Sequence, residues 1–213
     1  MKIKWLGHAT FLITSDTGTK IITDPYAPAE KLTYGEIKES ADIVTVSHDH
    51  FDHSNVASVQ GKPEVARGNS VLKGIKFHGI PTYHDQAQGQ QRGNNTIFCF
   101  EVDGLKICHL GDLGHQLTDK QVAEIGKVDI LLVPVGGFYT IDSSMAGKTF
   151  DQLKPRVIIP MHFKTSKCAF PISGVDEFLK GKKDISRLDA SEIEFWAREL
   201  PSDTQIIVLK PAL

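Results

Sequence analysis

Short strand-like segments separated by turns constrain the fold of this chain more than any other feature. In the first half, apolar residues recur at every second position in runs bounded by turn-forming residues, and this period of two is typical of strands. An Asp-Gly pair at positions 103 and 104 marks a tight hairpin turn. We predict strands over residues 2–6, 10–14, 20–24, 42–47, 74–83, 96–101 and 106–110.

The second half of the chain mixes helices with strands. Its apolar periodicity predicts helices over residues 118–125, 143–153, 175–179 and 191–200, and its apolar runs predict strands over residues 130–135, 156–160 and 205–209. Strands feed helices in both halves with no linker between them. We therefore expect two sheets packed face to face with helices outside, in a single α/β (α+β type) domain spanning residues 1–213.

Charge and composition exclude several classes of partner. The 24 basic and 26 acidic residues give a net charge of −2 with no dense basic run, so no nucleic-acid partner is expected. No stretch approaches the roughly 20 apolar residues of a membrane helix, and the N-terminus lacks the pattern of a secretory signal. Three widely spaced cysteines fit reduced thiols better than a disulfide framework. These features predict a cytoplasmic protein that does not insert into a membrane.

The densest chemical signal is a group of imidazoles and carboxylates directly after the apolar segment 43–46. Residues 47–53 read Ser-His-Asp-His-Phe-Asp-His. Imidazole nitrogens and carboxylate oxygens are the ligands that Zn²⁺ and related ions accept, and such a density of them is rare in an ordinary solvated loop. The period of two places His48 and His50 on one side, where they can share one ion. Asp52 and His53 follow the turn and can face a second ion.

Two ions need more ligands than one loop supplies, and three later residues are candidates. His84, Asp112 and His162 each follow an apolar strand, from which a side chain can project into a cleft at the sheet edge. The carboxylate of Asp112 can bridge both ions. A single histidine or aspartate at a strand end is more often a turn or cap residue, so the group at residues 48–53 is what favours the metal-binding interpretation.

The order of these motifs resembles that of the metallo-β-lactamase superfamily. The match runs from Thr23-Asp24 through His48-x-His50-x-Asp52-His53 to His84, Gly111-Asp112 and His162. Residues 6–11 (Leu-Gly-His-Ala-Thr-Phe), 23–26 (Thr-Asp-Pro-Tyr) and 111–115 (Gly-Asp-Leu-Gly-His) resemble a branch of metal-dependent hydrolases related to ascorbate-6-phosphate lactonases and N-acylphosphatidylethanolamine phospholipase D. The resemblance implies a four-layer αβ/βα sandwich with the metal ions at one edge.

The resemblance also implies a role for each motif residue. It assigns the first ion to His48, His50 and His84, the second to Asp52, His53 and His162, the bridge between them to Asp112, the orientation of ligands to Asp24, and a contact near the cleft to His8 and His115. Zinc is the expected ion, with manganese, iron and nickel as alternatives, because His and Asp sites accept all four. His78 and His109 are expected in the core or on the surface.

These assignments imply a metal-dependent hydrolase acting on a small molecule. A hydroxide bridging two divalent ions would attack a lactone, ester, amide or phosphoester, and Asp52 is a candidate proton acceptor. The alternative is a metal-binding or sensing protein of the same fold without turnover. The fold alone does not choose a substrate, because one scaffold supports several chemistries. Some relatives self-associate, so the resemblance also implies a possible homo-oligomer.

Overall fold

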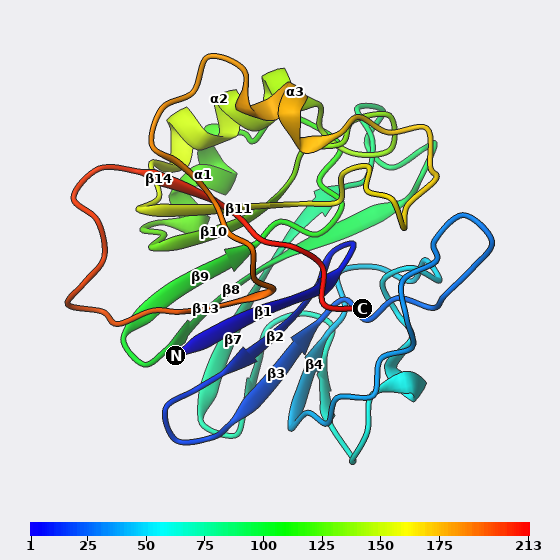
Figure 1. Ribbon diagram of the computed structural model, residues 1–213, viewed down its shortest axis with the longest axis vertical. Coiled ribbons are helices and arrows are strands. Elements are labelled where there is room, and N and C mark those ends of the chain that lie inside the picture. The colour runs from blue at the N-terminus through cyan, green and yellow to red at the C-terminus, as the bar shows by residue number, and fades with distance from the viewer.

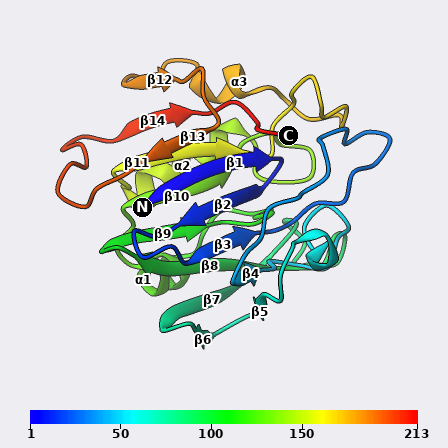
Figure 2. The same ribbon diagram turned by 60° about the horizontal axis from the view of Figure 1, so that its bottom comes forward.

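Two β-sheets packed against each other make up most of the molecule, as the computed structural model of residues 1–213 shows (Figure 1). The smaller sheet has the spatial order β13 (Glu192–Glu194), β1 (Lys2–Gly7), β2 (Thr10–Thr14), β3 (Lys20–Thr23), β4 (Ile43–Thr45) and β5 (Glu64–Ala66). The larger sheet has the order β12 (Ile185–Arg187), β14 (Gln205–Val208), β11 (Val157–Met161), β10 (Ile130–Pro134), β9 (Leu105–His109), β8 (Asn94–Val102), β7 (Ile75–Tyr83) and β6 (Ser70–Leu72). The C-terminal part of the chain therefore adds strands to both sheets (Figure 2).

The two faces of the smaller sheet bury different residues, as a period of two requires. Ile21 on β3 and Ile43 on β4 are paired and belong to the main apolar core, which also contains the larger sheet. The next pair, Ile22 and Val44, belongs to a second apolar cluster on the opposite face. Both faces of the smaller sheet are thus covered, although the chain forms no α-helix before Thr118.

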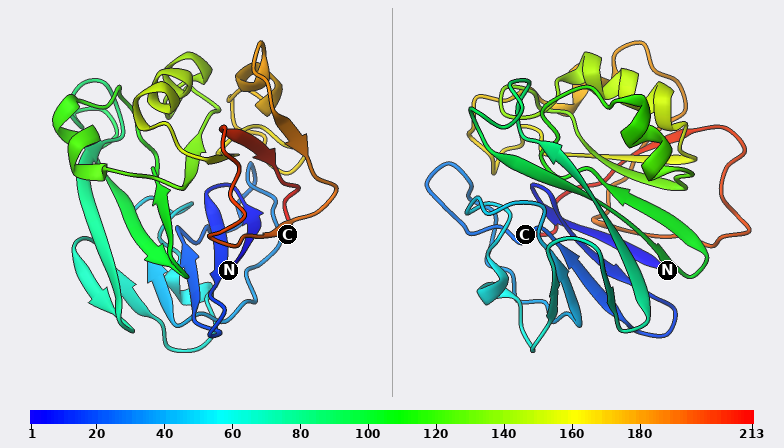
Figure 3. Two further views of the ribbon diagram at one scale, coloured as in Figure 1. Left: turned by 90° about the vertical axis from the view of Figure 1, so that its left-hand side faces the viewer. Right: turned by 180° about the vertical axis from the view of Figure 1, so that it is seen from behind.

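An irregular segment, residues 24–42, covers the outer face of the smaller sheet in place of helices. Tyr26, Leu32, Tyr34 and Ile37 are buried there with Ile22 and Val44. The three α-helices, α1 (Asp119–Ile125), α2 (Ser143–Leu153) and α3 (Val175–Leu179), all lie along the larger sheet (Figures 1 and 3). The two-sheet α/β fold class is confirmed, with α-helices on one side of the sandwich and the short 3₁₀ turn η1 (Val56–Ser58) as the only helical element on the other.

Local capping explains why the two longer helices begin where the sequence predicts. The Thr118 hydroxyl accepts a hydrogen bond from the Gln121 N–H, and the Gln121 side chain accepts one from the Thr118 N–H, which forms a capping box before α1. Asp142 accepts a hydrogen bond from the Met145 N–H at the start of α2. Each cap satisfies backbone donors that have no partner inside the helix.

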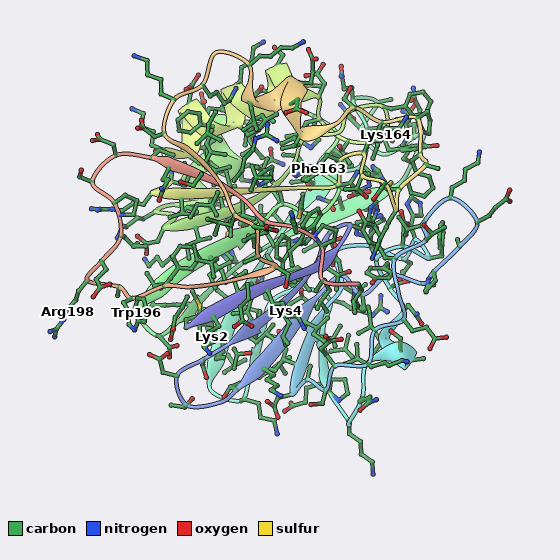
Figure 4. All side chains as sticks on the ribbon, in the orientation of Figure 1. Lys2, Lys4, Phe163, Lys164, Trp196 and Arg198 are labelled. Atoms are coloured by element: carbon green, nitrogen blue, oxygen red, sulfur yellow. The ribbon has the colours of Figure 1, made fainter.

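The predicted helix over residues 191–200 is wrong, because this segment contains strand β13 instead. Its burial alternates with a period of two, from half-buried Ile193 through exposed Glu194 to buried Phe195. Residues 192–194 pair with β1, so their backbone groups form hydrogen bonds within the sheet and not within a helix. Trp196 and Arg198 follow on an exposed loop that leaves the sheet (Figure 4), and Trp196 is 48% exposed. The very short strands β5, β6 and β12 are elements that the sequence analysis does not predict.

Parallel pairing brings the loops that follow several strands to one edge. Strands β9, β10 and β11 run parallel in the larger sheet, and β3 and β4 run parallel in the smaller one. The two edges are joined near these loops, because the Thr96 N–H donates to the Ser47 carbonyl at 2.9 Å and the His162 N–H donates to the His8 carbonyl at 3.1 Å. None of the helices is long and apolar enough to cross a membrane.

Candidate metal centre

The loop after β4 carries four of the proposed ligands, and Asp24 fixes its start. The Ser47 N–H donates to one carboxylate oxygen of Asp24 at 2.8 Å, and the Ser47 hydroxyl donates to the other. That second oxygen also lies 2.9 Å from His53 Nδ1. Asp24 is fully buried, with a φ of 40° at the end of β3. Its carboxylate therefore sets both the path of the loop and the direction in which His53 Nε2 points.

Asp112 lies at the centre of the imidazoles that the sequence singles out. Its Oδ2 atom is 3.1 Å from His84 Nε2, 3.2 Å from His53 Nε2, 3.3 Å from His162 Nε2 and 3.9 Å from His48 Nε2. These residues follow β4, β7, β9 and β11, so both sheets contribute to one cluster. The arrangement suits a carboxylate that bridges two ions.

The ligand atoms form two main groups. His48, His50 and His84 make one group, and the other consists of His8, Asp52, His53 and His162; within each group the ligand atoms lie within 4.8 Å of one another. The two triads inferred from sequence are thus brought together, and His8 joins the second of them. Asp24 also lies within this distance of His48 and His53.

Buried polar atoms without partners show that the cluster fits a bound cation. His53 Nε2 and Asp112 Oδ1 are both buried and have no hydrogen-bond partner in the protein. Leaving such atoms unpaired costs free energy, because burial removes them from water. A divalent ion coordinated by imidazole nitrogens and carboxylate oxygens would satisfy them, and this donor set is the one that zinc and similar ions accept.

Electrostatics hold most of these ligands in the forms that bind metal ions. Burial, together with nearby His53, lowers the pKa of His48 to about 3. Burial raises the pKa of Asp112, but His162 and His53 outweigh it and hold that pKa well below its usual range. Burial likewise opposes a charge on His53, yet Asp112 and Asp52 raise the His53 pKa well above its ordinary value. These carboxylates therefore favour a positive charge at His53, as a bound cation would supply.

His8 is placed beside Asp52. Its Nε2 lies 3.1 Å from Asp52 Oδ2, and its ring centroid is 4.1 Å from that of His162. Burial and the neighbouring His162 lower the pKa of His8 to about 4, so the neutral ring donates from Nε2 to the carboxylate. The expectation that His8 acts near the cleft is consistent with this contact, which orients Asp52.

The other histidines lie outside the cluster. His115 Nε2 accepts the Tyr83 N–H at 3.2 Å and its Nδ1 donates to the Gln116 carbonyl at 2.9 Å, so both ring nitrogens are used by the backbone. The structure does not bring His115 to the proposed ligands. His109 is buried and donates from Nε2 to the Ala9 carbonyl, as expected of a core residue. His78 is on the surface, 3.4 Å from Glu124.

Asn95 is a supporting residue that the sequence analysis missed. Its Oδ1 accepts the Asp112 N–H at 2.9 Å, and its Nδ2 donates to the Thr82 hydroxyl at 2.7 Å and the Leu110 carbonyl at 3.0 Å. A Cβ on Gly111 would lie 2.3 Å from Asn95 Oδ1, so only glycine allows this approach. Asparagine is common in loops, and nothing in the sequence ties position 95 to Asp112.

A cleft of about 500 Å³ opens onto the cluster. Five of the proposed ligands line it: His50, Asp52, His84, Asp112 and His162. The rest of its lining consists of three aromatic side chains, Asp49, Gln91 and a single arginine, Arg92. A small molecule entering this cleft would therefore contact the proposed ligands directly.

Comparison with known proteins identifies the family. The sequence pattern of a family described as a beta-lactamase superfamily domain matches residues 2–162. A metal-dependent hydrolase of the UPF0173 group from Carboxydothermus hydrogenoformans is 35% identical over 78% of this chain and 85% of that protein. Another from Archaeoglobus fulgidus is 28% identical and is matched over 99% of this chain and 96% of that protein.

A solved structure from Thermotoga maritima agrees with this result. It is described as a candidate zinc-dependent hydrolase of the metallo-β-lactamase superfamily, and it is 40% identical to this chain with a TM-score of 0.81 over 98% of this chain and 97% of that one. Homologues of the chain are thus named metal-dependent hydrolases. The match to the family pattern and these similarities together show that this chain belongs to the metallo-β-lactamase superfamily.

Proposed function

We propose that this chain is a binuclear metal-dependent hydrolase that cleaves a lactone, ester, amide or phosphoester of a small molecule. The observation that carries the proposal is the convergence of four imidazole Nε2 atoms on the carboxylate of Asp112 at the floor of an open cleft. Two divalent ions bound there would supply a water with a pKa lowered toward about 7 and would polarise an oxygen of the substrate.

The residues of the chain have separate tasks in this proposal. His48, His50 and His84 would hold one ion and His53, His162 and Asp52 the other, with Asp112 available as a ligand to either. Asp24 accepts a hydrogen bond from His53 Nδ1 at 2.9 Å and so fixes its tautomer, with Nε2 free to bind. Because the ligands come from both sheets, the fold holds the cluster in place before substrate arrives.

Asp52 is our candidate for the group that accepts a proton during the reaction. It lines the cleft, is held by the hydrogen bond from His8, and has a pKa that nearby His53 and His8 lower against the effect of burial. We expect Asp52→Asn to lower kcat about 100-fold or more at full metal occupancy, in the range that general base catalysis contributes. Unchanged kcat in a fully loaded Asp52→Asn protein would refute this role.

Metal content and turnover test the proposal together. Metal bound per chain is measured by plasma emission spectroscopy for the wild type, Asp112→Ala and His78→Gln. Hydrolysis is followed with an aryl ester, a lactone, an anilide and bis(4-nitrophenyl) phosphate. We expect close to two ions in the wild type and in His78→Gln, whose histidine is on the surface, and fewer in Asp112→Ala. Turnover should be lost with chelator and return with zinc or manganese.

Two results separate the alternatives. Full metal occupancy with no turnover of any bond class in the panel would favour a metal-binding or sensing protein. No more than trace metal after reconstitution with zinc or manganese would overturn both functions and leave only the fold.

A further inference from the structure

Arg92 is the only arginine or lysine that lines the cleft over the metal ligands. It also lines two adjoining hollows of about 430 Å³ and 370 Å³, so its side chain stands where three openings meet. No carboxylate lies within ion-pair distance of it. The exposed carboxylate at the same cleft, Asp49, pairs with Arg67 instead. The cleft therefore presents one positive charge that the protein does not neutralise.

An aromatic ring supports the guanidinium of Arg92. The central carbon of the guanidinium lies 5.7 Å from the centroid of the Tyr139 ring, a distance at which a cation is attracted to an aromatic face. A cation–π contact of this kind uses none of the guanidinium N–H groups as hydrogen-bond donors. A planar guanidinium binds the two oxygens of a carboxylate or phosphoryl group through parallel hydrogen bonds.

The loop that carries Arg92 is held rigid by one buried carboxylate. Asp85 accepts the backbone N–H groups of Arg92 at 2.7 Å and Gln91 at 3.0 Å on one oxygen, and those of Ala87 at 2.7 Å and Gly89 at 2.9 Å on the other. Asp85 directly follows the proposed ligand His84, whose N–H donates to the Gly93 carbonyl. The position of Arg92 is thus tied to the metal centre before any ligand binds.

An apolar wall continues from Arg92 toward the cluster. The Tyr139 ring lies 5.8 Å from Phe170, which in turn lies 5.9 Å from His8. Phe51 also lines the cleft and is 51% exposed, although its neighbours in the loop bind metal in our proposal. An uncharged, apolar part of a substrate would fit against these rings, with its reactive carbonyl or phosphoryl group near the proposed ligands and an anionic group at Arg92.

We infer that the substrate is a small organic oxyanion, with a carboxylate or phosphate group held by Arg92 and an apolar segment between that group and the bond that is cleaved. This inference rests on the proposed hydrolase function. Arg92 acts as the residue that selects the charged substrate, and Asp85 positions it.

Two esters of equal length test the inference by kinetics. The mono-4-nitrophenyl ester of glutaric acid carries a free carboxylate, and 4-nitrophenyl valerate replaces that group with a methyl group. We expect the wild type to prefer the anionic ester in kcat/KM. Arg92→Gln should raise KM for the anionic ester about 10- to 100-fold, as loss of a hydrogen bond to a charged group implies, with its kcat and both constants for the neutral ester unchanged. Arg92→Lys should restore part of the loss.

Arg198→Gln is the matched control, because it removes the same charge from an exposed side chain that does not line the cleft. It should leave both esters unaffected. Metal content is measured for every variant, and Arg92→Gln should hold as much metal as the wild type. Equal losses for the anionic and neutral esters, or no loss in Arg92→Gln, would overturn the inference.

Direct binding separates this inference from the hydrolase proposal. The ethers 5-phenoxypentanoate, 4-phenoxybutylphosphonate and 5-phenoxypentanol contain no lactone, ester, amide or phosphoester bond, and their affinities are measured by calorimetry. We expect both anions to bind the wild type more tightly than the alcohol, with the advantage lost in Arg92→Gln. The anion with the larger Arg92-dependent gain identifies the head group. Arg92-dependent binding without turnover would support the anion site and contradict the hydrolase proposal. Turnover with equal binding of all three ethers would contradict the anion site alone.

Discussion

Asp49 lies within the loop of residues 47–53 and Asp24 lies beside it. Of the two carboxylates, only that of Asp24 contacts a proposed ligand. Asp24 is buried and accepts a hydrogen bond from His53 Nδ1 at 2.9 Å. The side chain of Asp49 is 82% exposed and pairs with Arg67. We predict that Asp24→Asn weakens metal binding about 10- to 100-fold, the usual cost of losing a partner that orients a ligand. Competition with a fluorescent chelator measures the affinity.

Asp49→Asn is the control for this prediction, because it makes the same chemical change in the same region of the molecule. It should bind metal as the wild type does, and both variants should retain the wild-type circular dichroism spectrum. Equal affinities in the two variants would contradict the orienting role of Asp24.

Sequence alone is sufficient to propose the ligands and to single out Asp24 and His8 beside them, but not the other residues that support them. His48, His53 and Asp112 stand out because ligand-type side chains follow apolar strands in a recognisable order. Asn95 and Asp85 do not, since asparagine and aspartate occur in many loops and turns. Their importance comes from contacts with backbone atoms that only the folded chain brings near, such as the Asp112 N–H at 2.9 Å from Asn95.

At the scale of elements, the loop of residues 85–93 depends on the ionised form of Asp85. Burial raises the pKa of Asp85, but four backbone N–H groups, first that of Arg92, lower it to below its usual value. A group with a lowered folded-state pKa stabilises the fold fully above its unfolded pKa of about 3.9, and this contribution is lost as the pH falls through the lower folded pKa. We predict that the wild type melts at a higher temperature than Asp85→Asn at pH 7, and that this difference shrinks below about pH 4.

Hydrogen exchange locates the effect of Asp85→Asn. In the wild type, two backbone N–H groups donate to each carboxylate oxygen of Asp85. In Asp85→Asn, one of these pairs would face an amide NH₂ group, which cannot accept. Exchange in residues 85–93 should therefore become faster, while exchange in β10 stays unchanged. A melting difference that stays constant from pH 7 to about pH 3 would contradict the assignment to Asp85.

A second element, the turn after β9, packs against the same loop through Gly114. A Cβ at this position would lie 2.2 Å from the Asp85 nitrogen. We predict that Gly114→Ala lowers the free energy of unfolding by about 1–3 kcal/mol, as overpacking does. Gly68→Ala is the control, because nothing lies within 4 Å of its Cβ position, and it should change the free energy by less than about 0.5 kcal/mol. Urea denaturation measures both, and equal effects would contradict the prediction.

Elements with strong periodicity or clear caps are predicted well, and weakly marked ones are not. Helix α2 occupies the predicted residues 143–153, and strand β2 the predicted residues 10–14. Residues 191–200 are the failure, since the alternation of Ile193 and Phe195 competes with good helix formers in the same segment. Strands β5 and β12 have three residues each, which is too short for a period to be recognised.

For the whole molecule, the sequence predicts two packed sheets but not what covers the smaller one. Helices cover only the larger sheet, while Tyr26 and Tyr34, with ring centroids 5.5 Å apart, help an irregular segment to cover the other. The Tyr26 hydroxyl donates to the Gly35 carbonyl at 2.8 Å, so a buried polar group is satisfied without regular structure. Such a layer has no period, and sequence patterns therefore do not reveal it.

The proposed metal centre lies where the two sheets meet, so metal binding should stabilise the whole fold. The proposed ligands follow β4 in the smaller sheet and β7, β9 and β11 in the larger one. A ligand at 100 times its Kd stabilises the native state by about 2.7 kcal/mol. For a domain of this size, roughly 2–4 °C of melting temperature corresponds to each kcal/mol, which gives a rise of roughly 5–10 °C for each ion. Scanning calorimetry of chelator-treated protein before and after addition of zinc measures this rise.

Two variants show where the zinc binds. The melting temperature of His78→Gln should rise as much as that of the wild type, and that of Asp112→Ala much less, because Asp112, unlike His78, contacts proposed ligands from both sheets. A rise of the same size in all three proteins would show instead that zinc binds elsewhere on the surface.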